Sequence, residues 1–508
     1  MKKNNTVVKN IISAILNQVI VIIYGFIVPI IIIKNFGSEV NGLISSIAQF
    51  LAYISLLEGG IGPVIKNSLF KPLVDKNTDE LGKILGASDN FFKKLSFAFI
   101  IYIVILCVVY PNFVDNKYSL FFTISLILII SINHLAEYFF GITYSLFLKA
   151  DQKNYFVDNL NSISYLFNLF LIVILVKCGA GILLIKLLSS VVYIIKPIII
   201  RIYFKKKYKI KLNKEKTYKF EKQWDGLAHH IAATVQSNTD VMLLTIFTNL
   251  INVSIYSVYS LITNGINCII VSLTNGIDAF FGKKMAQSNS INSSFEVYSF
   301  IFYTITTILL SMTLILIVPF IEIYTSSIKD ANYIVPLFAY LMVFAEFNFA
   351  IRYPYSSIVY ANGNFKETSK YAIAEPLVNI LVSLLLVHKF GLIGVAIGTL
   401  VSTPIRSIGF IYYGATKILK TNFWNRFKQI FVSMIQLIIV FSIYLLVGGI
   451  KVNTYFKWFT IAVFLIIPIS IFIVLSNALI FNKTFKDILK ILKRKSMINE
   501  EFKKIIKR

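Results

Sequence analysis

The sequence predicts an all-α, polytopic membrane protein, and three observations support this prediction. Of the 508 residues, 57% are hydrophobic and only 15% are charged, whereas about 25% of a typical soluble domain is charged. The mean hydropathy is +0.75. Apolar runs long enough to cross a hydrocarbon core of about 30 Å as helices recur along the whole chain. Runs of this length also exclude a transmembrane β-barrel, whose strands alternate over about ten residues.

We expect about fourteen transmembrane helices. The first lies in an apolar run from about Ile11 to Ile33, which is too long for the core of a signal peptide. Polar or Gly/Asn/Pro-rich segments separate the runs. The expected spans are 10–33, 40–65, 95–111, 119–148, 156–176, 180–203, 225–248, 252–281, 295–324, 333–361, 368–388, 391–415, 429–448 and 456–480.

The basic residues predict how the chain is oriented in the membrane. The formal net charge is +26, and most lysines and arginines fall in alternate loops and in the two terminal segments. Cytoplasmic loops carry such an excess of positive charge, so both termini are expected in the cytoplasm. Nucleic-acid binding is a poor alternative because the charge lies beside apolar spans. The C-terminal segment suits an amphipathic helix on anionic lipid, or a solvated anchor.

The chain contains an internal repeat. Tyr144–Phe156 matches Tyr355–Glu367 at a spacing of 211 positions, and the order of loops and helices is shared. The repeat predicts two pseudo-symmetric six-helix lobes with a substrate path between them, followed by two extra helices. The expected domains are an N-terminal lobe (1–204), a basic cytoplasmic linker (205–224), a C-terminal lobe (225–415), two additional transmembrane helices (416–481) and a basic cytoplasmic tail (482–508).

Four basic residues lie inside apolar spans, Lys186, Lys196, Arg352 and Arg406, and the last three are candidate site residues. Arg352 and Arg406 each sit near a proline, and Lys196 falls one residue from the counterpart of Arg406 in the first lobe. A charge at this depth is costly unless it faces water or a partner. Because arginine holds phosphate oxygens in a planar fork, we interpret these three residues as the lining of a cavity for an anionic, phosphate-bearing substrate. The alternative is that each merely pairs with a buried carboxylate and holds helices together.

Several carboxylates also lie within the spans. A buried carboxylate can take up and release a proton, which would couple transport to an ion gradient. The candidates for this role are Asp240, Glu137, Glu346 and Glu375. Asp240 stands among polar neighbours in HHIAATVQSNTDVMLL. Glu58 and Asp278 are expected to cap helices or to pair with lysines, and the histidines are weaker candidates.

Enzymatic activity is not expected. No P-loop is present, and no soluble loop carries the cluster of carboxylates that a sugar-transferring enzyme needs for its metal and sugar nucleotide. The three cysteines, Cys107, Cys178 and Cys268, are too scattered for a metal site. We therefore expect neither a catalytic residue nor a metal ligand.

The sequence resembles the polysaccharide transporter family, the Wzx-type O-antigen, capsule and teichuronic-acid flippases of the MATE-like (MOP) exporter superfamily. The resemblance covers the first twelve spans nearly end to end. It rests on NGLISSIAQFLAYISLLEGGIGPVIKNSLFKPL from Asn41, LKADQKNYF from Leu148, HHIAATVQSNTDVMLLTIF from His229, VSIYSVYSLI from Val253 and RYPYSSIVYANGNFKETSKYAIAEPLVNI from Arg352.

This resemblance implies a bacterial cytoplasmic-membrane protein that moves undecaprenyl-diphosphate-linked oligosaccharide by alternating access. It implies two lobes around a V-shaped cavity, a proton or sodium gradient instead of a cofactor, and polysaccharide polymerase and glycosyltransferases as partners. Related lipid II flippases place arginines in early helices, but the first two spans here have only Lys34 and Lys66 near their ends. A MATE-like multidrug or cation antiporter is the alternative and should have a net acidic lining. A membrane glycan polymerase or ligase is a third hypothesis. It would need a sizeable outer loop with a catalytic arginine or histidine, and the sequence predicts no such loop.

Overall fold

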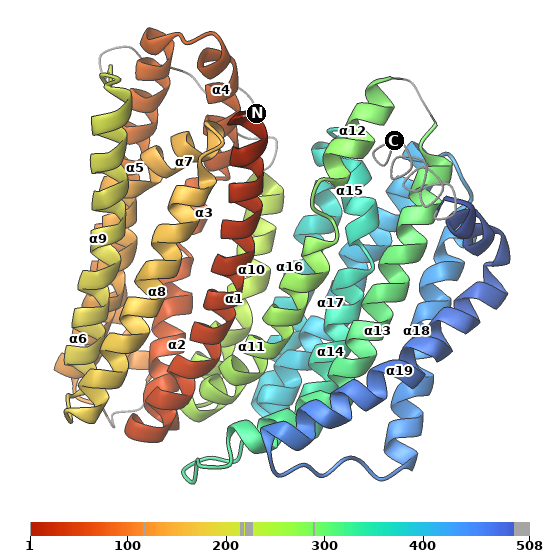
Figure 1. Ribbon diagram of the computed structural model, residues 1–508. Helices are drawn as coiled ribbons and strands as arrows, with labels where there is room; N and C mark the ends of the chain where they lie inside the picture. Colours follow the sequence, from red (N-terminus) through yellow and green to blue (C-terminus); the bar gives the residue numbers. More distant parts are fainter. Residues whose placement is uncertain (1, 115–117, 214–217, 219–226, 288–289, 492–508) are drawn as a thin grey trace, which may run out of the picture. The chain divides into compact units, whose positions relative to one another are not determined.

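The computed structural model describes residues 2–114, 118–213, 218, 227–287 and 290–491, and all secondary structure in this part of the chain is helical (Figure 1). Twelve helices among these residues are long and apolar enough to cross a membrane. The predicted all-α, polytopic fold is therefore confirmed, whereas the count of fourteen is not. The described residues of the two further expected spans, 225–248 and 333–361, are mostly helical. The first is the polar helix α10, and the second is interrupted at Ile351–Arg352.

Contacts between Cα atoms divide the chain into two compact units. Unit 1 comprises residues 1–261, 328–331 and 387–395, and unit 2 comprises the rest. The helices of unit 1 are α1 (Lys2–Phe36), α2 (Ser38–Ala52), α3 (Ser55–Glu58), α4 (Ile61–Val74), α5 (Thr78–Val109), η1 (Tyr110–Phe113), α6 (Leu120–Ala136), η2 (Glu137–Gly141), α7 (Ile142–Ala150), α8 (Asn154–Lys177), α9 (Ile182–Tyr208), α10 (Leu227–Phe247) and the first half of α11 (Leu250–Ser272).

Unit 2 takes up the second half of α11 and nearly all of the chain that follows. Its helices are α12 (Ile277–Ala286), α13 (Asn292–Tyr324), α14 (Pro336–Ala350), α15 (Tyr353–Ala361), α16 (Phe365–Phe390), α17 (Leu392–Tyr413), η3 (Gly414–Ile418), α18 (Phe423–Leu446) and α19 (Tyr455–Ile480); the last residues of α16 and the first of α17 belong to unit 1.

These units differ from the expected lobes because α10 packs on α2 and α3. Pairs of side-chain hydroxyl groups join these helices: Ser46 with Thr245 at 2.7 Å, Tyr53 with Thr239 at 3.0 Å and Ser55 with Thr234 at 3.3 Å. The boundaries of the lobes stay a prediction. Within the expected linker, residues 214–217 and 219–224 lie outside the described residues, as do residues 492–508 of the expected tail; residues 482–491 are helical.

Local sequence explains where several helices begin. At the start of α5, the side chain of Asn77 accepts a hydrogen bond from the backbone N–H of Glu80 at 3.0 Å, and two acidic residues occupy the first turn. Such caps satisfy N–H groups that have no partner inside the helix, and the acidic residues complement the helix dipole. Ser119, Asn422 and Thr454 cap α6, α18 and α19 in the same way.

The two halves of the chain share their helix breaks. Gly60 and Gly276, 216 positions apart, precede α4 and α12 with φ values of 68° and 80°. Gln152 and Gly363, 211 positions apart, follow α7 and α15 with φ values of 57° and 76°. Positive φ is uncommon outside glycine, so the conformation at Gln152 indicates that the turn itself is repeated.

One contact between helices recurs at the same spacing. Lys196 of α9 lies 3.1 Å from the carboxylate of Glu137 in the π-helical segment η2. The residues 211 positions later are Ser407 of α17 and Asn348 of α14, and the Ser407 hydroxyl donates to the Asn348 carbonyl at 2.5 Å. The second half thus keeps the contact and replaces the ion pair with a neutral hydrogen bond.

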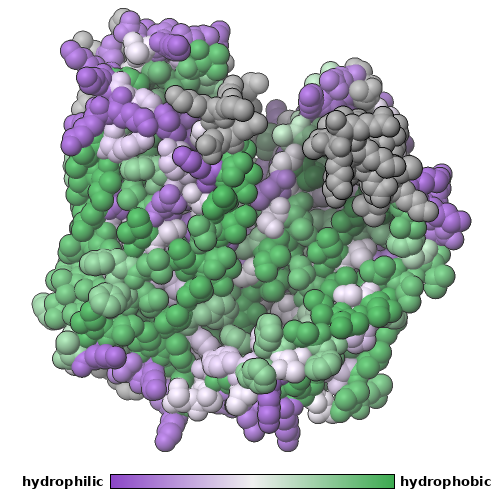
Figure 2. Space-filling view, viewed as in Figure 1, coloured by the Kyte–Doolittle hydropathy of each residue, from purple (hydrophilic) through white to green (hydrophobic). Residues whose placement is uncertain are grey.

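The surface fits a lipid environment. In Figure 2, hydrophobic residues cover the sides of the helices, and hydrophilic residues gather towards helix ends. Many of the exposed large side chains are aliphatic or aromatic, as on α1 and α19. A soluble protein rarely exposes apolar patches of this extent. The chain is therefore a multi-pass membrane protein, and the orientation of its termini stays a prediction.

Candidate functional site

Arg352, Glu375 and Arg406 meet in the interior of unit 2. Arg352 lies at the break between α14 and α15, Glu375 in α16 and Arg406 in α17. The Arg352 Nη1 atom donates to Glu375 Oε1 at 2.7 Å, and Arg406 Nη1 donates to Oε2 at 3.3 Å. The exposed fractions of the three side chains are 9%, 0% and 7%, respectively. Two guanidinium groups therefore share a single fully buried carboxylate, one on each oxygen.

A proline accompanies each of these charged residues. Pro354 follows Arg352 by two positions, Pro376 directly follows Glu375, and Pro404 precedes Arg406 by two. Proline donates no backbone hydrogen bond and so leaves a carbonyl group of the preceding turn without its usual partner. Other groups in a membrane helix bundle satisfy such carbonyls.

One such carbonyl group, and another at the helix break, have side-chain partners in the structure. The Leu400 carbonyl, four residues before Pro404, accepts a bond from the Asn348 side chain at 3.5 Å and another from Thr403 at 3.4 Å. At the break before Arg352, the Ile351 carbonyl accepts a hydrogen bond from the Tyr303 hydroxyl at 2.8 Å. The three charges thus sit on helices whose regular hydrogen bonding is interrupted.

Aromatic rings and a second carboxylate surround the arginines. The guanidinium of Arg352 lies 3.9 Å from the centre of the Phe349 ring, an attractive cation–π geometry. Arg406 donates to the Tyr360 hydroxyl at 3.3 Å. Glu346 lies within electrostatic reach of Arg352 and accepts a hydrogen bond from Asn267 at 2.6 Å. The structure therefore brings together four residues singled out in the sequence: Arg352, Arg406, Glu346 and Glu375.

The remaining candidates lie in unit 1. Lys196 pairs with Glu137, and both are part-exposed, at 20% and 32%. Asp240 is buried in α10 and accepts a hydrogen bond from Tyr256 of α11 at 2.9 Å. The expectation that Lys196 and the two arginines line one cavity between lobes stays a prediction, as does an ion-coupling role for the carboxylates.

Glu58, expected to cap a helix or to pair with a lysine, has a tyrosine as its partner. It ends the short helix α3, ahead of two glycines with positive φ, and accepts a hydrogen bond from the Tyr138 hydroxyl of η2. His230 of α10 donates to the Ser55 carbonyl at 2.7 Å and lies beside the same break. The broken motif LLEGGIG signalled a special position here. Nothing in the sequence connected it with a tyrosine some 80 residues away.

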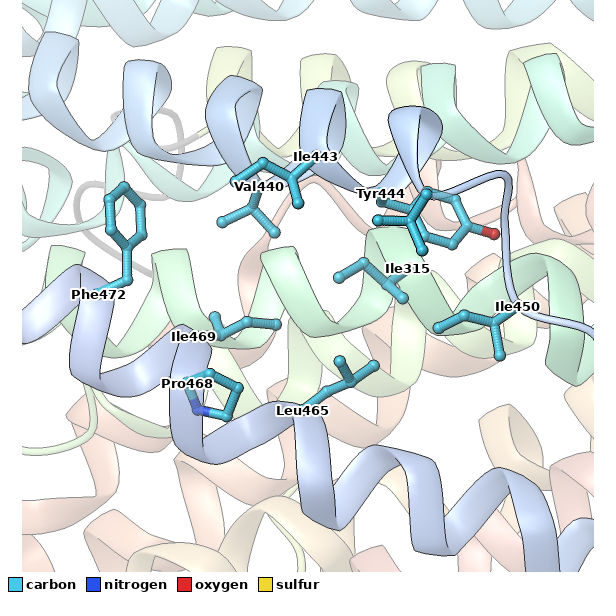
Figure 3. A pocket seen from close by; sticks show the side chains of 10 residues that line it. Ile315, Val440, Ile443, Tyr444, Ile450, Leu465, Pro468, Ile469 and Phe472 are labelled. Atoms are coloured by element: carbon cyan, nitrogen blue, oxygen red, sulfur yellow. The ribbon is translucent and has the colours of Figure 1, made fainter.

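A cavity of about 360 Å³ lies among α13, α18 and α19 of unit 2 (Figure 3). Its lining is almost entirely aliphatic and aromatic, and the side chains from the three helices point towards one another in Figure 3. Pro468 lies inside α19 at this point. The lining residues are Ile315, Val440, Ile443, Tyr444, Val447, Ile450, Leu465, Pro468, Ile469 and Phe472. No motif in the sequence predicted this cavity.

Comparison with solved structures shows which fold these helices form. The lipid II flippase MurJ, in an inward closed conformation, matches with a TM-score of 0.64 and 18% identity over 94% of this chain and 99% of that one. An inward-facing multidrug resistance MATE family transporter of the MOP superfamily matches with a TM-score of 0.63 and 11% identity, over 81% and 99%. This chain has the fold of the MOP superfamily.

A third solved structure with this fold is described as having a binding pocket of reverse polarity. It is a MOP superfamily transporter from Pyrococcus furiosus, and its pocket is described as suggesting a different function (TM-score 0.56, 12% identity, 82% of this chain and 96% of that one). Comparison of the sequence with protein families and with curated proteins finds no match. At these identities the MOP fold is shown, and the substrate must be argued from the residues.

Proposed function

We propose that this protein is a flippase that moves undecaprenyl-diphosphate-linked oligosaccharide repeat units across the bacterial cytoplasmic membrane. The observation that carries the proposal is the convergence of Arg352 and Arg406 on the carboxylate of Glu375. Two guanidinium groups that donate to one anionic group could donate to the oxygens of a diphosphate in the same way. A solved relative in fold is a lipid II flippase, which makes a lipid-borne substrate reasonable for this chain.

The cavity among α13, α18 and α19 supports a substrate with a lipid chain. Its lining is almost entirely aliphatic and aromatic, and its volume of about 360 Å³ is large enough for part of a polyprenyl chain. Apolar burial is worth about 0.8 kcal/mol for each CH₂ group. Such a cavity would retain the lipid while the charged head group binds elsewhere in the protein.

An exporter of cationic drugs is the alternative, because MATE transporters share the MOP fold. A cation site should present more carboxylates than basic groups. Here Arg352 and Arg406 share one carboxylate, and the nearby Glu346 at most balances the second guanidinium. Two basic groups against two carboxylates lack the acidic excess that a cation site should present.

The energy source and the partners belong to the same proposal. A proton or sodium gradient would drive alternating access, with Asp240, Glu137, Glu346 and Glu375 as candidate coupling groups. Polysaccharide polymerase and glycosyltransferases would act after and before the flippase, at the cytoplasmic membrane, with both termini of this chain in the cytoplasm.

Reconstituted vesicles test the proposed function directly. The full-length protein is placed in liposomes with a fluorescent polyprenyl-diphosphate disaccharide, and a membrane-impermeant reagent quenches the lipid that reaches the outer leaflet. Export of the labelled lipid, without export of a cationic dye, is expected. Transport of the dye alone would favour the antiporter.

A further inference from the structure

The two arginines already bind an anion in this conformation. Each oxygen of Glu375 accepts a hydrogen bond from a different guanidinium, at 2.7 and 3.3 Å. A diphosphate offers the same feature, acceptor oxygens that separate forked donors can hold. The carboxylate is wholly buried, and its partners are 9% and 7% exposed. A phosphate group that binds both arginines therefore competes with this carboxylate for their N–H donors.

The charge balance makes this occupancy reversible in principle. Glu375 divides one negative charge between two guanidinium groups, and Glu346, which lies within electrostatic reach of Arg352, is itself bonded to Asn267 at 2.6 Å. A buried cation without a counter-charge is strongly destabilising. An anionic ligand with two negative charges would satisfy both arginines better than Glu375 does.

The helix that carries Glu375 lacks a backbone hydrogen bond next to the carboxylate. Pro376 lies directly after it within α16, so the backbone there has no hydrogen bond to the preceding turn. Proline sites are where long helices kink. The arginines stand on similarly interrupted segments, next to Pro354 and Pro404. The group therefore has the local freedom to exchange partners.

We propose that Glu375 is a resident anion that occupies the phosphate site of the empty protein and is displaced when the diphosphate of the substrate binds. This inference rests on the proposed function, because it takes Arg352 and Arg406 as the phosphate site. It assigns Glu375 a role as competitor and placeholder. If Glu375 only held helices together, its removal would not raise the affinity for diphosphate.

Inorganic diphosphate is the probe, titrated calorimetrically into the purified full-length protein and followed in parallel by the rise in its unfolding temperature. Glu375→Gln should bind diphosphate about tenfold or more tightly than the unchanged protein, since one charge-assisted competitor is gone. Its thermal shift should be larger too. Asp89→Asn, which removes the buried carboxylate that pairs with Lys93 at 2.8 Å in unit 1, is the matched control and should leave the affinity unchanged.

Equal or weaker binding by Glu375→Gln overturns the proposal, and so does the absence of binding in every variant. If Glu375→Gln does not fold, Glu375→Asp replaces it, because its shorter side chain cannot keep both bonds and should also raise the affinity. Arg352→Gln and Arg406→Gln separate the two ideas. If the arginine variants no longer bind diphosphate while Glu375→Gln binds it no more tightly than the unchanged protein, the phosphate site is supported and the role of Glu375 as a resident anion is wrong. If they bind as the unchanged protein does, the phosphate site itself is wrong.

Discussion

Arg352 and Arg406 donate to opposite oxygens of one carboxylate, that of Glu375, although they come from different helices. Both guanidinium groups contact this one carboxylate. This shared arrangement distinguishes the pair from Lys196 and Glu137, which form a simple one-to-one ion pair in unit 1. The difference leads to the first prediction, because removal of an arginine that shares its carboxylate and removal of the lysine that has its own should have unequal effects on transport.

We expect Arg352→Ala or Arg406→Ala to abolish surface polysaccharide while the protein stays in the membrane. Each change leaves Glu375 paired with the remaining arginine, so the carboxylate is not left without a partner. The diphosphate, however, loses one of its two guanidinium partners. Immunoblots of surface glycan and of membrane fractions measure the two quantities. Lys196→Ala is the comparison and should reduce export less. Normal glycan display in both arginine variants would contradict the mechanism.

We expect Asp240→Asn to remove the response of export to external pH. If protons drive transport, export by the unchanged protein slows as the external pH rises, and the amide variant is slow at every pH because it cannot carry the proton. Vesicle transport at a series of external pH values checks this. Tyr256→Phe removes the hydrogen bond at 2.9 Å but keeps the charge, so it should retain the pH response. An Asp240→Asn protein with the response intact would exclude Asp240 as the proton carrier.

We expect Gly276→Ala to lower the stability of unit 2 by about 1 to 2 kcal/mol, since alanine at positive φ is strained. Gly276 has a φ of 80°, and nothing lies within 4 Å of an added Cβ, so backbone strain is the whole effect. The apparent unfolding temperature in detergent should fall. Gly265→Ala is the matched control, since Gly265 is helical and also has open space around an added Cβ. It should be neutral or slightly stabilising.

The sequence could predict the fold because the signal in long apolar runs is strong and local. The two arginines were visible for the same reason, as charges where charge is costly. Their partner could only be narrowed to a few carboxylates, since the choice of Glu375 depends on how α15, α16 and α17 are rotated about their axes. The bond between Glu58 and Tyr138 joins different spans and leaves no pattern in the sequence. The interruption at Ile351–Arg352 was likewise not predicted, although Pro354 marked its neighbourhood.

The approach of α17 to α16 holds Arg406 against Glu375 and gives the last prediction. A Cβ added at Gly409 would lie 2.3 Å from the Tyr371 ring, so Gly409→Ala forces the two helices apart or the ring aside. Overpacking of this kind costs about 1 to 3 kcal/mol. We expect a lower unfolding temperature and weaker export, because the contact of 3.3 Å between Arg406 and Glu375 lengthens. The double variant Gly409→Ala with Tyr371→Ala removes the clash and should recover most of the export. Failure of the second change to restore export would show that Gly409 acts through something other than this contact.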